Sequence, residues 1–319
     1  MLYGLYSGAR CDRLMWGVGR NRLRILAYHG VCDDHLGREP WMPSFFVTRS
    51  AFEYQMQYLT RHACVLPLEE AVDRLYAGDL PEGAVSVTFD DGYANNLHLA
   101  YPILRELRVP ATIFLATAYP LSGELFPFDR VTLVAHHTQG LARRGHANRP
   151  PLVEYGSHPL DVVLERLEPW WDETSAALSH AQRESLRPLR TGELEAFDDD
   201  RIDFGAHTHS HCILRNEDPA RRRWEVAQSI ELTGRLTGRQ PRLFSFPNGR
   251  PGDFDEQDKL SVRTAGVKAA VSTSSGTNRP TSDRFQLARY SIGLAHTASS
   301  FAAEVTGLRS AMTSLVGRV

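Results

Sequence analysis

Two adjacent carboxylates, Asp90 and Asp91, stand directly after a short apolar stretch and are the first residues whose types and spacing suggest chemistry. The stretch Ala84–Phe89 alternates large apolar residues with hydroxyl residues, which predicts a β-strand. Gly92 then provides a backbone that permits a sharp turn. Paired acids at a strand end can hold a metal ion or move a proton, although Asp and Gly are also common in simple surface turns. Because a helical pattern and another apolar stretch follow, we expect a βαβ unit with its functional groups at the strand ends.

Three histidines, His207, His209 and His211, lie within five residues after another strand-like stretch. Imidazoles bury poorly without partners and repel one another when protonated, and metal binding removes both difficulties. In an extended strand all three would share a face, whereas in a helical turn His207 and His211 share a face and His209 points away. We favour the turn, because a loop and a helix that begins with an Asp-Pro pair follow. With Asp91 as third ligand, the set leaves open coordination positions, as catalytic metal sites do.

The elements that would position these residues alternate between strands and helices along most of the chain. We expect strands at 23–28, 84–89, 111–116, 201–205, 243–246, 267–271 and 285–292. We expect helices from residue 50, where Ser50 and Glu53 have capping-box spacing, and at 68–76, 93–108, 218–236, 260–265 and 299–308. His29 follows the first strand, so it can face the same mouth as Asp90.

The alternation breaks between residues 120 and 200, where Pro, His and Arg are scattered. We expect an insertion with helices near 129–136, 160–170 and 174–186. We predict that it covers part of the active-site mouth and restricts the substrate; the alternative is an interaction surface. Trp170 and Trp171 either form the insertion's own core, which we favour, or stack on sugars. We expect the acidic run 198–200 and the basic run 221–223 to be solvated.

Composition limits the classes of function. The chain has 319 residues, 42% of them hydrophobic, and a net charge of −2, so it can bury a full core and lacks the basic footprint of a nucleic-acid-binding protein. Its four cysteines, without paired spacing, are expected to be reduced. Residues 1–24 combine aromatic residues with arginines and either pack on the domain as an amphipathic segment, which we favour, or contact a membrane surface. No apolar run suggests a transmembrane helix or a signal peptide, and we expect a cytoplasmic protein, peripheral to the inner membrane face if residues 1–24 bind it.

Two motifs together resemble the NodB-homology polysaccharide deacetylases, carbohydrate esterase family four: Thr-Phe-Asp-Asp-Gly at 88–92 and His-Thr-His-Ser-His at 207–211. Weaker similarities are the Tyr-His stretch at 25–31, Tyr-Pro-Ile-Leu at 101–104, Pro-Ala-Thr-Ile-Phe at 110–114, Phe-Ser-Phe-Pro-Asn-Gly at 244–249, the segment 265–271 and Leu-Ala-Arg at 287–289. The resemblance covers residues 25 to 295, apart from the insertion.

The resemblance implies a divalent metal, usually zinc, bound by Asp91, His207 and His211, with Asp90 as the general base. A backbone N–H near Asn248 would help to stabilise the oxyanion.

Two positions depart from the family pattern. Many members carry an arginine just ahead of the proline in the third motif, where it orients the catalytic aspartate, and here Ser245 and Phe246 occupy that place. Arg289 is the candidate substitute. Many members also supply a general-acid histidine from the last strand. His296 is the candidate here, and His29 from the first strand is its rival.

We therefore predict an α/β fold, an irregular (β/α) barrel of the NodB-homology type over residues 25–297, with 120–200 as a helical insertion. Residues 1–24 form an N-terminal amphipathic segment and 298–319 a C-terminal helix. The predicted function is metal-dependent removal of N-acetyl groups from an N-acetylated polysaccharide or lipid-linked saccharide, as in exopolysaccharide biosynthesis, with His29 and Asn248 contacting the substrate. The alternatives are hydrolysis of a different amide or ester at the same site, and a carbohydrate-binding protein that has lost its chemistry.

Overall fold

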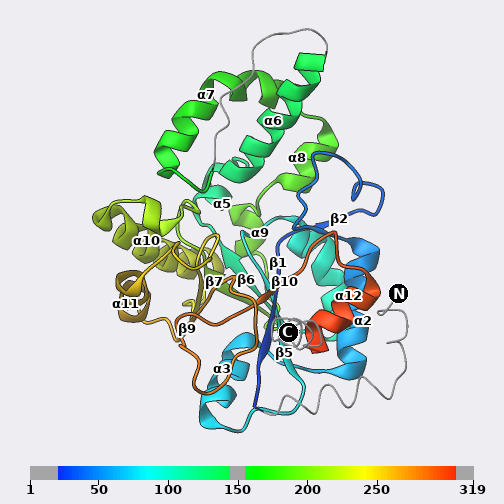
Figure 1. Cartoon of the computed structure of the whole chain (residues 1–319), viewed down its shortest axis with the longest axis vertical. Helices are drawn as coiled ribbons and strands as arrows, with labels where there is room; N and C mark the ends of the chain where they lie inside the picture. The colour runs from blue at the N-terminus through cyan, green and yellow to red at the C-terminus, as the bar shows by residue number, and fades with distance from the viewer. Residues whose placement is uncertain (1–20, 144–154, 307–319) are drawn as a thin grey trace, which may run out of the picture.

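A sheet of parallel strands forms the centre of the molecule in the computed structural model, which describes residues 21–143 and 155–306 (Figure 1). Its strands are β1 (Arg24–Tyr28), β4 (Cys64–Val65), β5 (Ala84–Phe89), β6 (Ala111–Leu115), β7 (Ile202–Ala206), β8 (Leu243–Ser245), β9 (Ala269–Val271) and β10 (Tyr290–Ser291). Their order is β10-β1-β5-β6-β7-β8-β9, and β4 pairs with β5. Almost every residue of these strands is buried, as expected for a parallel sheet that is covered on both faces.

Helices surround this sheet (Figure 1). They are α2 (Arg49–His62), α3 (Leu68–Ala77), α4 (Tyr101–Leu107), α5 (Ala118–Ser122), α6 (Pro127–Arg143), α7 (Leu160–Ala177), α8 (His180–Leu186), α9 (Thr191–Glu195), α10 (Pro219–Thr237), α11 (Glu256–Thr264) and α12 (Ala298–Thr306). A π-helical turn at Asn96–Ala100 precedes α4, a 3-10 turn lies at Leu214–Asn216, and β2 (Val31–Cys32) pairs with β3 (Val47–Thr48). None of the helices in the described ranges is long and apolar enough to cross a membrane.

One short segment links the two edges of the sheet. Leu287 pairs with Val271 of β9, and Tyr290 pairs with Leu26 of β1. The predicted irregular barrel is therefore confirmed. The single strand expected at 285–292 is wrong in extent, because neighbouring parts of this segment pair with different strands and only Tyr290–Ser291 forms a ladder.

Several predicted element ends move by a few residues. Thr48, not Ser50, caps α2: its hydroxyl accepts the N–H of Ala51, whereas the Ser50 hydroxyl donates to Asp34. The helix expected at 93–108 begins later, at the π-helical turn, because Tyr93 belongs to the turn after β5 and pairs with the backbone of Pro188. The cap at Asp218 is confirmed, since its carboxylate accepts the first N–H groups of α10.

The basic run 221–223 is not uniformly solvated, contrary to expectation. Arg222 is only 9% exposed, and its guanidinium forms ion pairs with Asp255 and Asp258 at the start of α11. Position 222 faces inward because α10 packs on α11 along that side. The cysteines in the described part, Cys32, Cys64 and Cys212, are unpaired.

The insertion is helical in its described parts, with α6, α7 and α8 forming the upper lobe of Figure 1. Trp170 and Trp171 are partly buried against apolar residues of α6 and α7, which places them in the insertion's own core. A second cluster joins Phe126 and Leu186 of the insertion to Phe46 and Tyr93 of the barrel. The insertion is thus packed onto the loops at one end of the sheet. Most of the predicted segment 1–24 and the end of the helix predicted at 298–319 lie outside the described residues.

Candidate active site

The paired aspartates occupy a sharp turn at the carboxyl end of β5. The backbone N–H of Asp90 donates to the carbonyl of Tyr28 at 2.9 Å, which continues the pairing with β1. Asp91 then adopts a left-handed conformation with φ of 73°, and Gly92 follows with φ of 87°. The positive φ favours glycine at position 92, and a Cβ atom there would also lie 2.7 Å from Cδ2 of Leu115, whose side chain would have to shift. A left-handed aspartate is uncommon, and such conformations concentrate at functional sites.

The histidines lie in an irregular loop after β7, not in the helical turn that the spacing favoured. Thr208 and His211 both have positive φ values, of 58° and 57°. The backbone N–H groups of His209 and Ser210 each donate to one carboxylate oxygen of Glu225 at 2.8 Å, and Glu225 on α10 is fully buried. These bonds fold the loop so that its first and last histidines face the same side.

Asp91, His207 and His211 come together in a buried cluster whose potential ligand atoms lie within 4.8 Å of one another. The Nε2 atoms of His207 and His211 lie 3.5 and 3.0 Å from Asp91 Oδ1. His207 Nδ1 lies 2.7 Å from the carbonyl of Ser245, to which it can donate, so Nε2 is left for a metal. Both carboxylate oxygens of Asp91 are buried without a hydrogen-bond partner in the described structure. A divalent cation fits this donor set, because it would neutralise the buried anion.

Tyr155 supports the cluster from the insertion and was not singled out from the sequence. Its hydroxyl lies 2.7 Å from His211 Nδ1 and also contacts the carbonyl of the same residue. Phe128 packs on the His211 ring with the centroids 4.8 Å apart. These contacts fix the ring so that Nε2 faces Asp91. No periodic pattern surrounds Tyr155, and it is 56 positions from its partner, so the sequence offers no signal for this contact.

Arg289 contacts Asp90, the aspartate that it was predicted to orient in place of the missing arginine. Its fully buried guanidinium donates to Asp90 Oδ1 at 2.7 Å and to Oδ2 at 2.6 Å. Ser245, which occupies the motif position where many family members carry arginine, accepts a bond from Arg289 at 3.0 Å and donates to Asp90 at 3.3 Å. Arg289 therefore reaches Asp90 from a different strand segment, with the small Ser245 leaving room for it.

The charges in the site keep both aspartates ionised. Burial raises the pKa of Asp90, but the positive charge and hydrogen bonds of Arg289 outweigh burial and bring this pKa below its usual value. Burial also raises the pKa of Asp91, but the positive charge of His211 and the close approach of both imidazoles outweigh burial, so this pKa too is lowered.

His29 stands beside these groups at the end of β1. Its ring packs on Phe45 with centroids 4.8 Å apart, and its buried Nδ1 has no hydrogen-bond partner in the described ranges. Burial lowers the pKa of His29, and the negative charge of Asp91 partly opposes that shift. The Asn96 side chain donates to the His29 carbonyl at 2.6 Å, which holds the backbone at this point.

The remaining predicted site residues lie further from the cluster or are otherwise engaged. The Asn248 side chain donates to Asp253 at 2.8 Å, and its backbone has φ of 58° in the turn after β8. His296 Nδ1 contacts the backbone N–H of Gly293 at 3.1 Å, and its hydrogen bonds in the described structure involve neither aspartate nor the two clustered imidazoles. His209 faces away from the cluster, with Nδ1 2.9 Å from the Thr117 hydroxyl.

Comparison with known proteins agrees with this geometry. The sequence profile of the polysaccharide deacetylase family matches residues 77–161 and 167–270, more than half of the chain. The putative polysaccharide deacetylase YxkH of Bacillus subtilis is 20% identical over 290 residues, which cover 90% of this chain and 77% of that protein.

Two further similarities concern a shorter segment and the fold. The poly-β-1,6-N-acetyl-D-glucosamine N-deacetylase of Staphylococcus aureus is 35% identical over 77 residues, 24% of this chain and 27% of that protein. The solved structure of Streptococcus pyogenes deacetylase PplD in complex with acetate has a TM-score of 0.57 and 17% sequence identity, and covers 89% of this chain and 98% of that one. At this identity the likeness shows a shared fold, the irregular barrel of these deacetylases.

Proposed function

Because the chain belongs to the polysaccharide deacetylase family of hydrolases, we propose that it removes N-acetyl groups from a saccharide with a divalent metal held by Asp91, His207 and His211. The buried Asp91 carboxylate carries this proposal: its oxygens lack hydrogen-bond donors in the described structure and face two imidazole nitrogens. Two histidines and one carboxylate leave open coordination positions. When bound, the metal supplies Lewis acidity to the acyl carbonyl and to a water molecule.

Asp90 is the group that we assign to take a proton from the attacking water. It lies next to a proposed ligand, but both its oxygens are bonded to Arg289 and it is no member of the ligand cluster. The bidentate contact fixes the orientation of the carboxylate, and the positive charge keeps it ionised and able to accept a proton. Arg289 thus acts as a positioning residue, with Ser245 completing its hydrogen bonds.

His29 is the group that we assign to protonate the leaving nitrogen. It lies half-buried beside the two aspartates, and its buried Nδ1 has no hydrogen-bond partner in the described structure, whereas His296 Nδ1 is bonded to a backbone turn. The lowered pKa of His29 makes its imidazolium a stronger acid, so a proton on the ring is readily given to an amine. Water then contributes a hydroxyl to the acyl carbon and a proton to the nitrogen, and the products are acetate and a free amine.

Asn248 contributes through its backbone in this proposal. Its side chain is held by Asp253, and the Asn248 carbonyl accepts the Thr273 hydroxyl at 2.6 Å. These bonds stabilise a left-handed turn at the end of β8, next to the strand whose loop carries the histidines. A backbone N–H in this turn is the donor that we propose for the developing oxyanion.

The substrate that we propose is a β-linked N-acetylglucosamine saccharide, and the metal is zinc. Support for the sugar comes from the relative in Staphylococcus aureus, whose name specifies poly-β-1,6-N-acetyl-D-glucosamine and whose matched segment is only part of that protein. Support for zinc comes from the ligand types, since imidazole nitrogens with one carboxylate suit this ion. A cytoplasmic location stays a proposal that fractionation of the native cells tests.

Acetate release tests the proposal directly. The purified protein is stripped with a chelator, reloaded with zinc, and incubated with β-1,6-linked N-acetylglucosamine oligomers while acetate and free amine are measured. We expect equal amounts of both products from the reloaded protein and neither from the stripped protein. A zinc-loaded protein that releases no acetate from these oligomers, but cleaves another amide or an ester, would instead support a different substrate for the same site.

A further inference from the structure

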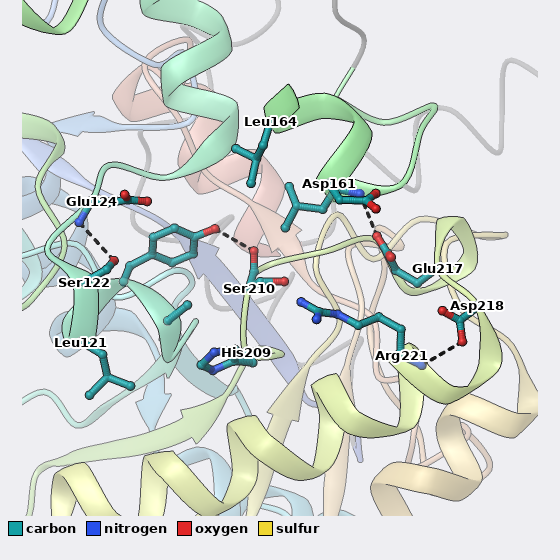
Figure 2. Close-up of a pocket in the computed structure, with 13 residues that line it drawn as sticks. Leu121, Ser122, Glu124, Asp161, Leu164, His209, Ser210, Glu217, Asp218 and Arg221 are labelled. Atoms are coloured by element: carbon teal, nitrogen blue, oxygen red, sulfur yellow. Dashed lines mark hydrogen bonds between the residues drawn. The ribbon is translucent and has the colours of Figure 1, made fainter. Parts of the chain in front are cut away.

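A hollow lies beside the loop that carries the histidines, on the side lined by His209 and Ser210 (Figure 2). It encloses about 620 Å³ and is lined by α5, the beginning of α7 and the beginning of α10. His209 and Ser210 line it, whereas His207 and His211 face Asp91. Its volume falls within the range of about 300–1,000 Å³ that is usual for small-molecule sites. We call this hollow the rear pocket.

The lining of the rear pocket is strongly negative. Four carboxylates line it: Glu124, Asp161, Glu217 and Asp218. The lining cation is Arg221, and its guanidinium is paired at 2.6 Å with the fully buried Glu225. A ligand of this pocket is therefore expected to carry a positive charge.

Two of the carboxylates, Glu124 and Asp161, are exposed and can therefore meet such a ligand. Glu217 accepts the N–H of Leu160 at 2.8 Å, and Asp218 caps α10, so both serve the local backbone. Glu124 and Asp161, both exposed, come from the insertion and lie on opposite sides of the hollow in Figure 2. Glu124 forms a long ion pair with Arg130 at 3.7 Å, and Asp161 accepts the N–H of Val162 at 2.8 Å.

Exposed apolar side chains complete the surroundings. Trp224 is 42% exposed and packs on two residues that line the pocket: its ring lies 5.1 Å from that of His209, and the Arg221 guanidinium lies 4.5 Å from its centroid. Leu121 lines the pocket and is 52% exposed. An exposed indole next to carboxylates suits a ligand with an apolar ring face and a charged substituent.

We propose that the rear pocket binds a cationic amino sugar, a hexosamine unit without its acetyl group. The choice of ligand rests on the proposed function, because deacetylation converts a neutral amide into an ammonium group. The ammonium pairs with Glu124 or with Asp161, which lie on opposite sides of the hollow, and the sugar ring packs toward Trp224, which borders the pocket beside His209 and Arg221. A neutral N-acetylated unit gains only the second contact, so the pocket prefers product to substrate. The protein would thereby hold a deacetylated part of a saccharide close to the site that acts on the acetylated part.

A tetramer of glucosamine tests this inference, because it has no acetyl group and is not consumed. Its affinity is measured by isothermal titration calorimetry, with and without a chelator, for the wild-type chain, Glu124→Gln/Asp161→Asn and Trp224→Ala. The matched control is Glu165→Gln/Asp172→Asn, which removes the same charge from exposed positions of α7 outside the pocket. We expect the pocket double variant to bind about tenfold more weakly, Trp224→Ala to bind more weakly, and the control to match wild type.

Three results would overturn the inference. An equal loss of affinity in the pocket variant and the control variant would show non-specific charge attraction. Loss of tetramer binding in the presence of the chelator would place the tetramer at the metal cluster. Equal affinity for the N-acetylated tetramer, measured with the chelator present, would show that the pocket does not recognise the ammonium group. Acetate release is assayed separately. If acetate is released but the tetramer does not bind, the pocket inference fails and the proposed function stands. If the tetramer binds as expected but no acetate is released, the proposed function fails and the amino-sugar site stands.

Discussion

His209 shares a loop with His207 and His211 but not their surroundings. Its ring contacts Thr117 and Trp224, whereas the other two face Asp91. We therefore predict that His207→Ala, His211→Ala and Asp91→Ala each lose bound metal and activity, while His209→Ala keeps both. Metal content per chain, measured by mass spectrometry on the purified variants, checks this. A His209→Ala protein without metal would show that the ligand set is wrongly assigned.

Asp90 and Asp91 are neighbours in the chain but have different partners. Because Asp90 is bonded to Arg289 and not to the cluster, we expect Asp90→Asn to keep its metal and to lose about 10²- to 10⁴-fold in kcat. Arg289→Lys should also keep the metal and lose less, since lysine keeps the charge but not the bidentate bond. Loss of metal from Asp90→Asn, or near-normal turnover, would contradict the division of roles.

Tyr155 is the residue through which the insertion reaches a ligand. Tyr155→Phe removes the hydroxyl, so His211 Nδ1 loses its hydrogen-bond partner and the imidazole ring is no longer held in one orientation. We expect metal affinity to fall by about 10- to 100-fold, the usual effect of losing such a supporting bond. Competition with a fluorescent chelator measures the affinity. Tyr54→Phe, at an exposed tyrosine, is the control and should bind metal as wild type does.

At the scale of elements, α10 holds the histidine loop through Glu225. This fully buried carboxylate accepts the N–H groups of His209 and Ser210 and the Ser210 hydroxyl, and pairs with Arg221. Glu225→Gln replaces one accepting oxygen with a donor that faces donors. We predict a loss of about 1–3 kcal/mol in the free energy of unfolding and weaker metal binding.

Thermal unfolding and metal competition measure the two effects of Glu225→Gln. The control is Glu231→Gln on the same helix, whose side chain is exposed and pairs only loosely with Arg235 at 3.8 Å. Equal unfolding temperatures for the two variants would show that Glu225 does not support the loop.

The elements that could be predicted from the sequence are those with a recognisable local residue pattern. The strand 84–89 ends in acids, and the helix after Asp218 begins with a cap and a proline, so both could be found locally. The histidine loop was predicted as a helical turn. Residue spacing indicates which side chains share a side, but it does not indicate that Thr208 and His211 have left-handed backbone conformations. Tyr155 and Glu225 could not be found, since their roles depend on how separate helices pack against one loop.

At the scale of the whole molecule, the insertion is tied to both loops that carry proposed ligands. Tyr155 bonds to His211, and Tyr93, two residues after Asp91, donates its buried hydroxyl to Asp129 of α6 at 2.7 Å. The backbone N–H groups of Ala94 and Leu189 join the turn after β5 to the end of the insertion. A detachable lid would make no such contacts. The insertion is therefore expected to belong to the scaffold of the metal site.

Two kinds of variant test this last expectation. We predict that replacing residues 120–200 with a short linker abolishes metal binding, because the contacts with His211 and with the turn after Asp91 are both lost. Such a large change can also prevent folding. The single variants Tyr93→Phe and Tyr155→Phe and the double variant therefore remove the two hydrogen bonds, one at a time and together, while the insertion is kept. Each contact supports a different loop of the metal cluster, so the double variant should bind metal more weakly than either single variant. A folded linker variant that binds one metal per chain, or a double variant no weaker than Tyr155→Phe alone, would show that the insertion is a separable cover.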